Sequence, residues 1–118
     1  MVRQWCFGNV VDFASGCGYG TWMISHNPDV DRVLGLDIDK GAIEWAKENF
    51  EEGSVKFICG DALNVEKYLI EENIDNVDTL VSLETIEHIK DTSIVPKVAD
   101  LCKASTVIVS FPSKKSTH

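Results

Sequence analysis

Short apolar runs alternate with longer amphipathic segments along almost the whole of this chain. The runs are rich in valine, isoleucine, leucine and phenylalanine, which is typical of strands buried on both faces. In the longer segments, apolar residues recur with the spacing of one helix face, as at Ile43, Ala46 and Phe50. The pattern predicts strands at residues 9–13, 32–36, 55–59, 77–83 and 106–111, and helices at residues 21–26, 39–50, 64–72 and 93–102.

Strands that alternate with helices at this spacing predict a parallel sheet with right-handed crossovers. The fold class is therefore α/β, with a Rossmann-like, doubly wound and mostly parallel sheet. Asp39 and Asn64 are expected to cap the helices that follow them, and Pro96 fits only in a first helical turn. We expect one domain over residues 1–118, with its core at about residues 9–111.

Charge and cysteine content exclude several classes of function. The chain has 11 basic and 19 acidic residues, a formal net charge of −8, which disfavours a broad nucleic-acid surface. Its four cysteines are scattered, so we predict neither a metal site nor a disulfide framework. No stretch approaches the roughly 18 apolar residues of a membrane helix, and no signal peptide opens the chain. We therefore expect a cytoplasmic protein without membrane contact.

The loop at residues 14–20 is the strongest functional signal, because small residues there follow a buried strand and precede a helix. Glycine at positions 16 and 18 lets the backbone approach a ligand closely. A dinucleotide site would have its third glycine three residues after the second, but Gly20 follows Gly18 by two. Asp12 would also repel a pyrophosphate, whereas it would favour a cationic or zwitterionic ligand. The loop therefore argues against NAD.

The pattern Asp12-x-Ala14-x-Gly16-x-Gly18 resembles motif I of the class I S-adenosylmethionine-dependent methyltransferases. The resemblance implies S-adenosylmethionine as cofactor, with Asp12 near its methionine end and the loop backbone, Ser15 included, holding it. It implies a strand order of 3-2-1-4-5, with the last two strands of the family fold missing.

The same resemblance extends to the ends of the second and third strands. Asp37 matches the acid that accepts both ribose hydroxyls, and a carboxylate can accept two such bonds at once. Ile38 would then pack on the adenine face. Asp61 and the Ala62 backbone N–H would bind the adenine edge.

The end of the fourth predicted strand carries the candidate catalytic residues. Residues 81–89 resemble the end of this strand in small-molecule methyltransferases of the family. The resemblance implies that carbonyl groups near Leu83 meet the cofactor's ammonium group and that Glu84 begins the surface that faces the substrate. Among the side chains of this segment, His88 is best suited to act as a base, with Glu87 beside it. A structural cap and a surface histidine remain an alternative for this pair. Glu84-x-x-Glu87-His88 also resembles the metal-ligand cluster of small-RNA 3′-terminal 2′-O-methyltransferases.

These residues predict methyl transfer to a small-molecule, sugar or lipid-linked acceptor. The alternative is an S-adenosylmethionine-binding module, or fragment, without catalysis. The uncharged strand at residues 106–111 would be an open edge of the sheet, so we also expect that two copies can pair through it.

Overall fold

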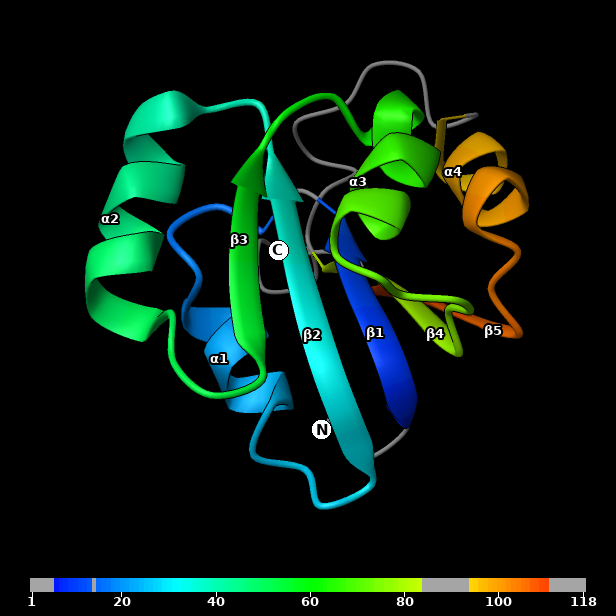
Figure 1. Ribbon diagram of the computed structural model, residues 1–118, viewed down its shortest axis with the longest axis horizontal. Coiled ribbons are helices and arrows are strands. Elements are labelled where there is room, and N and C mark those ends of the chain that lie inside the picture. Colours follow the sequence, from blue (N-terminus) through cyan, green and yellow to red (C-terminus); the bar gives the residue numbers. More distant parts are fainter. Residues whose placement is uncertain (1–5, 14, 84–93, 111–118) are drawn as a thin grey trace, which may run out of the picture.

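The computed structural model describes residues 6–13, 15–83 and 94–110. Within these residues, one sheet of parallel strands has the order β3-β2-β1-β4-β5, which confirms the predicted fold class and strand order. Figure 1 shows β1 near the middle of the sheet and α2 beside β3 at one side. The strands are β1 Gly8–Phe13, β2 Val30–Asp37, β3 Val55–Cys59, β4 Thr79–Leu83 and β5 Thr106–Ser110.

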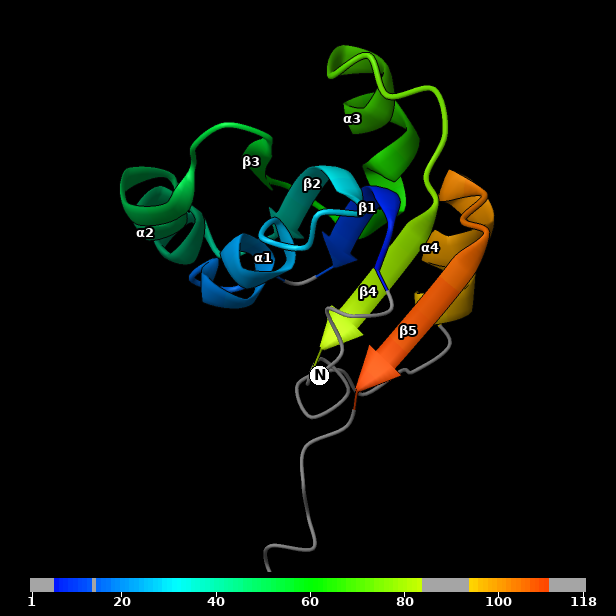
Figure 2. The same ribbon diagram turned by 90° about the horizontal axis from the view of Figure 1, so that it is seen from below.

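Helices cover both faces of the sheet, as Figure 2 shows, with α1 and α2 on one side and α3 and α4 on the other. Ile24 of α1 packs with Val10 and Val33, whereas Val98 of α4 packs in the cluster that contains Val11. The helices are α1 Tyr19–Ile24, α2 Lys40–Phe50, α3 Val65–Glu71 and α4 Ile94–Cys102, with a short 3-10 helix, η2, at Ala62–Asn64. No helix among the described residues is long and apolar enough to cross a membrane.

The element bounds lie within two residues of those predicted from the pattern. The helix α1 begins two residues earlier than predicted because Gly18, with φ +93°, ends the loop directly before it. Asp39 caps α2 as predicted, since its side chain accepts a hydrogen bond from Ala42 N–H at 3.1 Å. Asn64 takes the N-cap position of α3 as predicted, but its side chain makes no capping hydrogen bond. Instead, Asp61 accepts from Leu63 N–H at 2.9 Å and starts η2, which leads directly into α3.

The two edges of the sheet differ in how their backbone groups are satisfied. At β3, the Phe57 N–H donates to Glu51 Oε2 at 2.8 Å, and the Val55 N–H donates to the Glu52 carbonyl at 3.0 Å. A side chain thus occupies part of this edge. At the opposite edge, β5 pairs with β4 and with no other strand among the described residues, and its Val107 side chain is 43% exposed. Within the described part of the chain, β5 is therefore the more open edge.

Candidate functional site

The carboxyl ends of the parallel strands meet at one edge of the sheet, where the loop after β1 also lies (Figure 1). Open α/β sheets bind ligands at this edge, outside the strand ends. The strand order places β1 between β2 and β4, with β3 beyond β2. The predicted residues at or after the ends of β1, β2 and β3 are therefore brought to one side of the molecule.

The backbone of the glycine loop, defined here as residues 15–18, is tied to the end of β2. The Ser15 N–H donates to the Leu36 carbonyl and the Gly16 N–H donates to Asp37 Oδ2, both at 2.8 Å. The loop then closes on itself, because Gly18 N–H donates to the Ser15 carbonyl at 3.2 Å. Ser15 Oγ is buried and has no hydrogen-bond partner among the described residues.

Gly16 and Gly18 serve different purposes in this loop. Gly16 has φ +60°, and a Cβ added there would meet nothing within 4 Å, so the surface above it is open. Gly18 has φ +93°, and a Cβ there would lie 2.7 Å from Phe57 Cζ and 2.8 Å from Ala46 Cβ. Gly18 is thus required by packing, whereas Gly16 leaves space for a ligand.

Asp37 joins three segments through its carboxylate and its backbone. Besides Gly16 N–H, its side chain accepts from Asp39 N–H at 2.9 Å, and its carbonyl accepts from Gly60 N–H at 2.9 Å. An ionised carboxylate offers about four acceptor positions. These two side-chain bonds therefore leave capacity for further donors, such as hydroxyl groups, on this half-buried residue.

Asp12 is buried at the end of β1, with 3% of its surface exposed. Its Oδ2 accepts a hydrogen bond from Thr21 Oγ1 at 2.6 Å. The pKa of Asp12 is raised to about 7, mainly by burial and also by the nearby charge of Asp37, while the Thr21 bond acts to lower it. Sequence reasoning missed Thr21. Its only signal was a hydroxyl placed shortly after the loop, and nothing in the sequence pairs it with Asp12.

Two apolar side chains are exposed just beyond neighbouring strands. Ile38, directly after β2, is 75% exposed, and Leu63, shortly after β3, is 43% exposed. The prediction named Ile38 but not Leu63. Between them, Asp61 is exposed and uses one oxygen to cap η2, while Ala62 is buried. Exposed apolar surface at adjacent strand ends can stack against a flat ring.

The remaining predicted site residues are described in part or not at all. The backbone of Leu83 ends β4, in register with Ser110 of β5. Ala14, Glu84, Glu87 and His88 lie outside the described residues. Within the described residues, no group of three histidine, cysteine or acidic side chains is arranged to hold a metal ion.

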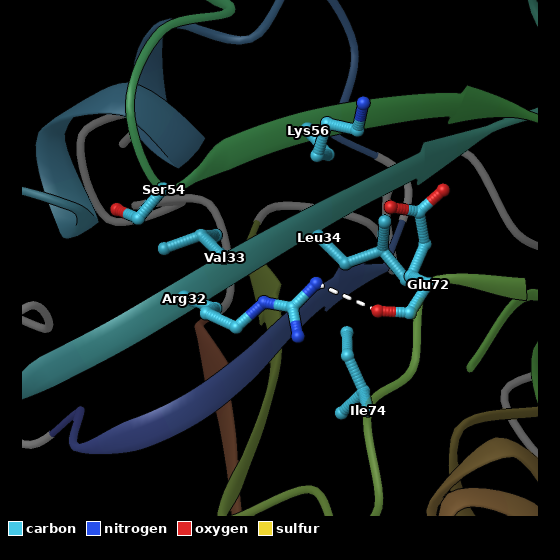
Figure 3. Close-up of a pocket in the computed structure, with 7 residues that line it drawn as sticks. All are labelled: Arg32, Val33, Leu34, Ser54, Lys56, Glu72 and Ile74. Atoms are coloured by element: carbon cyan, nitrogen blue, oxygen red, sulfur yellow. Dashed lines mark hydrogen bonds between the residues drawn. The ribbon is translucent and has the colours of Figure 1, made fainter. Parts of the chain in front are cut away.

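A shallow pocket lies near the other ends of β2 and β3, away from the predicted site residues (Figure 3). Its main polar contact is between the guanidinium of Arg32, which donates at 2.8 Å, and the carbonyl of Glu72. That carbonyl follows the last residue of α3. The contact therefore anchors the end of α3 to β2 and gives no sign of a ligand.

Comparison with known proteins gives one consistent family. A family model described as a methyltransferase domain matches residues 10–105. A malonyl-[acyl-carrier protein] O-methyltransferase from Acetivibrio thermocellus is 30% identical over 69 residues, which is 58% of this chain and 23% of the relative.

Two solved structures share the fold at lower sequence identity. An S-adenosylmethionine-dependent methyltransferase from Anabaena variabilis has a TM-score of 0.65 and 23% identity, over 86% of this chain and 42% of its own. The methyltransferase domain of bacterial CtHen1-CN has a TM-score of 0.70 and 19% identity, over 92% of this chain and 60% of its own. The chain thus spans less than two thirds of each of these relatives.

Proposed function

Because the chain belongs to the class I S-adenosylmethionine-dependent methyltransferases, we propose that it binds S-adenosylmethionine at the carboxyl edge of its sheet and transfers the methyl group. We further propose that the acceptor is a small-molecule, sugar or lipid-linked group. One observation carries the binding proposal: Asp37 holds the glycine loop through Gly16 N–H at 2.8 Å and retains acceptor capacity.

The described residues fit the parts of this cofactor. The ribose has two neighbouring hydroxyls, which suit the unused acceptor positions of Asp37. The adenine is a flat ring that could pack on Ile38, which is 75% exposed and directly follows Asp37. Gly16 has no neighbour within 4 Å of a Cβ position, so a ligand can approach the loop backbone. The methionine end carries positive charge, which an acid such as Asp12 would attract when ionised.

When bound, S-adenosylmethionine supplies a methyl group on a positively charged sulfur atom. The chain's own contribution is mainly to position the cofactor and exclude other poses, because little covalent help is needed. Asp37 and the loop backbone would orient the nucleoside, and carbonyl groups near Leu83 at the end of β4 would meet the cofactor's ammonium group. Glu84, Glu87 and His88 are proposed to face the acceptor, with His88 removing a proton where the acceptor carries one.

The choice of acceptor class rests on chemistry and on one relative. The relative from Acetivibrio thermocellus is named for methylating an acid carried on a protein. A net charge of −8 disfavours nucleic acid as the acceptor. Both observations support a small-molecule, sugar or lipid-linked acceptor over nucleic acid.

Calorimetry with S-adenosylhomocysteine tests binding directly. Asp37→Ala is expected to weaken binding by roughly 1–3 kcal/mol, because charge-assisted bonds are lost. Asp31→Ala is the matched control, since Asp31 is an exposed acid near the start of the same strand. No heat from the wild-type chain at millimolar ligand would contradict the proposal. Binding without demethylated product, across a panel of acceptors, would favour the non-catalytic module instead.

A further inference from the structure

Thr21 and Asp12 form a buried pair between α1 and β1. Thr21 has 0% of its surface exposed and Asp12 has 3%. The Thr21 hydroxyl donates to Asp12 Oδ2 at 2.6 Å, a short distance typical of a bond to a charged acceptor. Asp12 also pairs in register with Gly35 of β2 and Val81 of β4, so it lies on the middle strand of the sheet, with Thr21 above it on α1.

The position of this pair connects it to the glycine loop. Asp12 lies before the loop, and Thr21 lies after it as the third residue of the six-residue helix α1. The hydrogen bond thus spans the loop from one side to the other. A substitution at Thr21 would therefore act on the loop indirectly, through Asp12.

We propose that Thr21 is a positioning residue, whose hydroxyl holds the Asp12 carboxylate charged and in place beneath the glycine loop, toward the positively charged methionine end of the cofactor. This inference rests on the proposed function. It concerns a residue that neither the sequence pattern nor the resemblance singled out.

The charges around Asp12 explain why the hydroxyl matters. Burial favours the neutral form of Asp12, the Thr21 bond opposes it, and the charge of Asp37 at the end of β2 adds to the effect of burial. Cys6 is a second titratable group that interacts with Asp12 among the described residues, and burial together with Asp12 raises the pKa of its thiol to about 11, so it stays neutral. Among these groups, only Thr21 favours the charged carboxylate.

The experiment compares Thr21→Val, which removes the hydroxyl at nearly constant shape, with Thr21→Ser, which keeps it. Thr79→Val is the matched control: Thr79 is also 0% exposed, and its hydroxyl donates to the Phe7 carbonyl at 3.1 Å, at the start of β4. The first readout is the carboxyl ¹³C shift of Asp12 in the full chain, followed from pH 5 to pH 9. The second is the affinity for S-adenosylmethionine and for S-adenosylhomocysteine by calorimetry at pH 7.

We expect Thr21→Val to raise the titration midpoint of Asp12 by about one pH unit, because one hydrogen bond to the charged form is lost. Thr21→Ser and Thr79→Val should titrate like the wild type. At pH 7, Thr21→Val should bind S-adenosylmethionine roughly fivefold more weakly, with a smaller change for S-adenosylhomocysteine, which lacks the sulfonium charge.

Superimposed titration curves for Thr21→Val and the wild type would overturn the proposal, as would equal losses of the two ligands. If Thr21→Val does not fold, a midpoint shifted in Thr21→Ser would equally count against it. Wild-type protein that binds neither ligand at any pH would defeat the proposed function. The Asp12 titration would then still decide whether Thr21 controls the carboxylate.

Discussion

The Asp37 carboxylate accepts a hydrogen bond from the Gly16 N–H at 2.8 Å, which joins the end of β2 to the loop after β1. One side chain therefore shapes the loop and also supplies the acceptor proposed for the ribose. Because both roles use the same carboxylate, a change at Asp37 should affect loop order and ligand affinity together. Variants that separate these effects have to be sought at neighbouring residues.

Substitution of the two loop glycines should destabilise the fold by different amounts. Gly18→Ala is expected to destabilise the fold by about 2–5 kcal/mol, because positive φ and overlap with Phe57 and Ala46 act together. Gly16→Ala should cost only about 1–2 kcal/mol, since φ alone is unfavourable there. Urea unfolding measures both. Equal losses in the two variants would show that packing against Phe57 does not govern Gly18.

Ile38→Ala should weaken binding of S-adenosylhomocysteine without destabilising the fold. Ile38 is 75% exposed, so its truncation removes little buried surface from the free protein. Loss of its contact with the adenine should cost about 1 kcal/mol, or roughly fivefold in affinity. Ile70→Ala is a matched control, because Ile70 is 77% exposed on α3. Calorimetry that finds the two variants alike would remove Ile38 from the proposed site.

Asp12→Asn should make the free protein more stable at pH 8 than the wild type. Burial raises the pKa of Asp12 from 3.8 to about 7 on folding, so the unfolded chain releases this proton at lower pH than the folded one. Stability from the neutral carboxyl is fully present below pH 4 and is lost as pH rises through 7. The gain from Asp12→Asn should therefore grow over this window, to the order of 1–3 kcal/mol.

Thermal or urea unfolding at several pH values measures this difference. Asp31→Asn serves as control, because Asp31 is exposed on the neighbouring strand. A gain that is independent of pH would indicate that Asp12 is already charged throughout the range.

Val107→Lys should prevent association of two copies through β5. Val107 is 43% exposed on this edge strand, so a lysine is accommodated by the fold but places like charges together in a symmetric pair. Sedimentation velocity of the wild type should show a dimer that grows with concentration, and the variant should stay monomeric. Ile70→Lys is the control for added charge. A wild type that remains monomeric at high concentration would contradict this prediction.

The periodic pattern of apolar residues was sufficient to predict the architecture. The strand bounds and side-chain contacts that it did not predict depend on residues far apart in the sequence. The bounds of β3, Val55–Cys59, agree with the predicted ones, because Ser54 precedes the strand and a turn at Gly60 and Asp61 follows it. By contrast, β2 begins at Val30, before its apolar run, because Gly8 pairs with it there. The bond from Thr21 to Asp12 depends on the path of the loop between them, which no local rule supplies.

In the candidate site, too, the sequence predicted individual residues but not the contacts between them. Asp37 and Gly16 were named from the sequence, and their spacing along the chain was enough to place both at one sheet edge. Their direct contact was not predicted, because it depends on how tightly the loop turns back over β2. Leu63 was missed because an exposed leucine in a polar turn has no distinguishing local pattern.

The bond between Glu51 and the Phe57 N–H also sets a limit on assembly. Strand addition needs free backbone groups, and this side chain already occupies one on β3. Two copies joined through β5 about a two-fold axis would each present β3 outward, where the Glu51 side chain already occupies one backbone donor. We therefore expect such a pair to add further strands at β3 less readily than at β5.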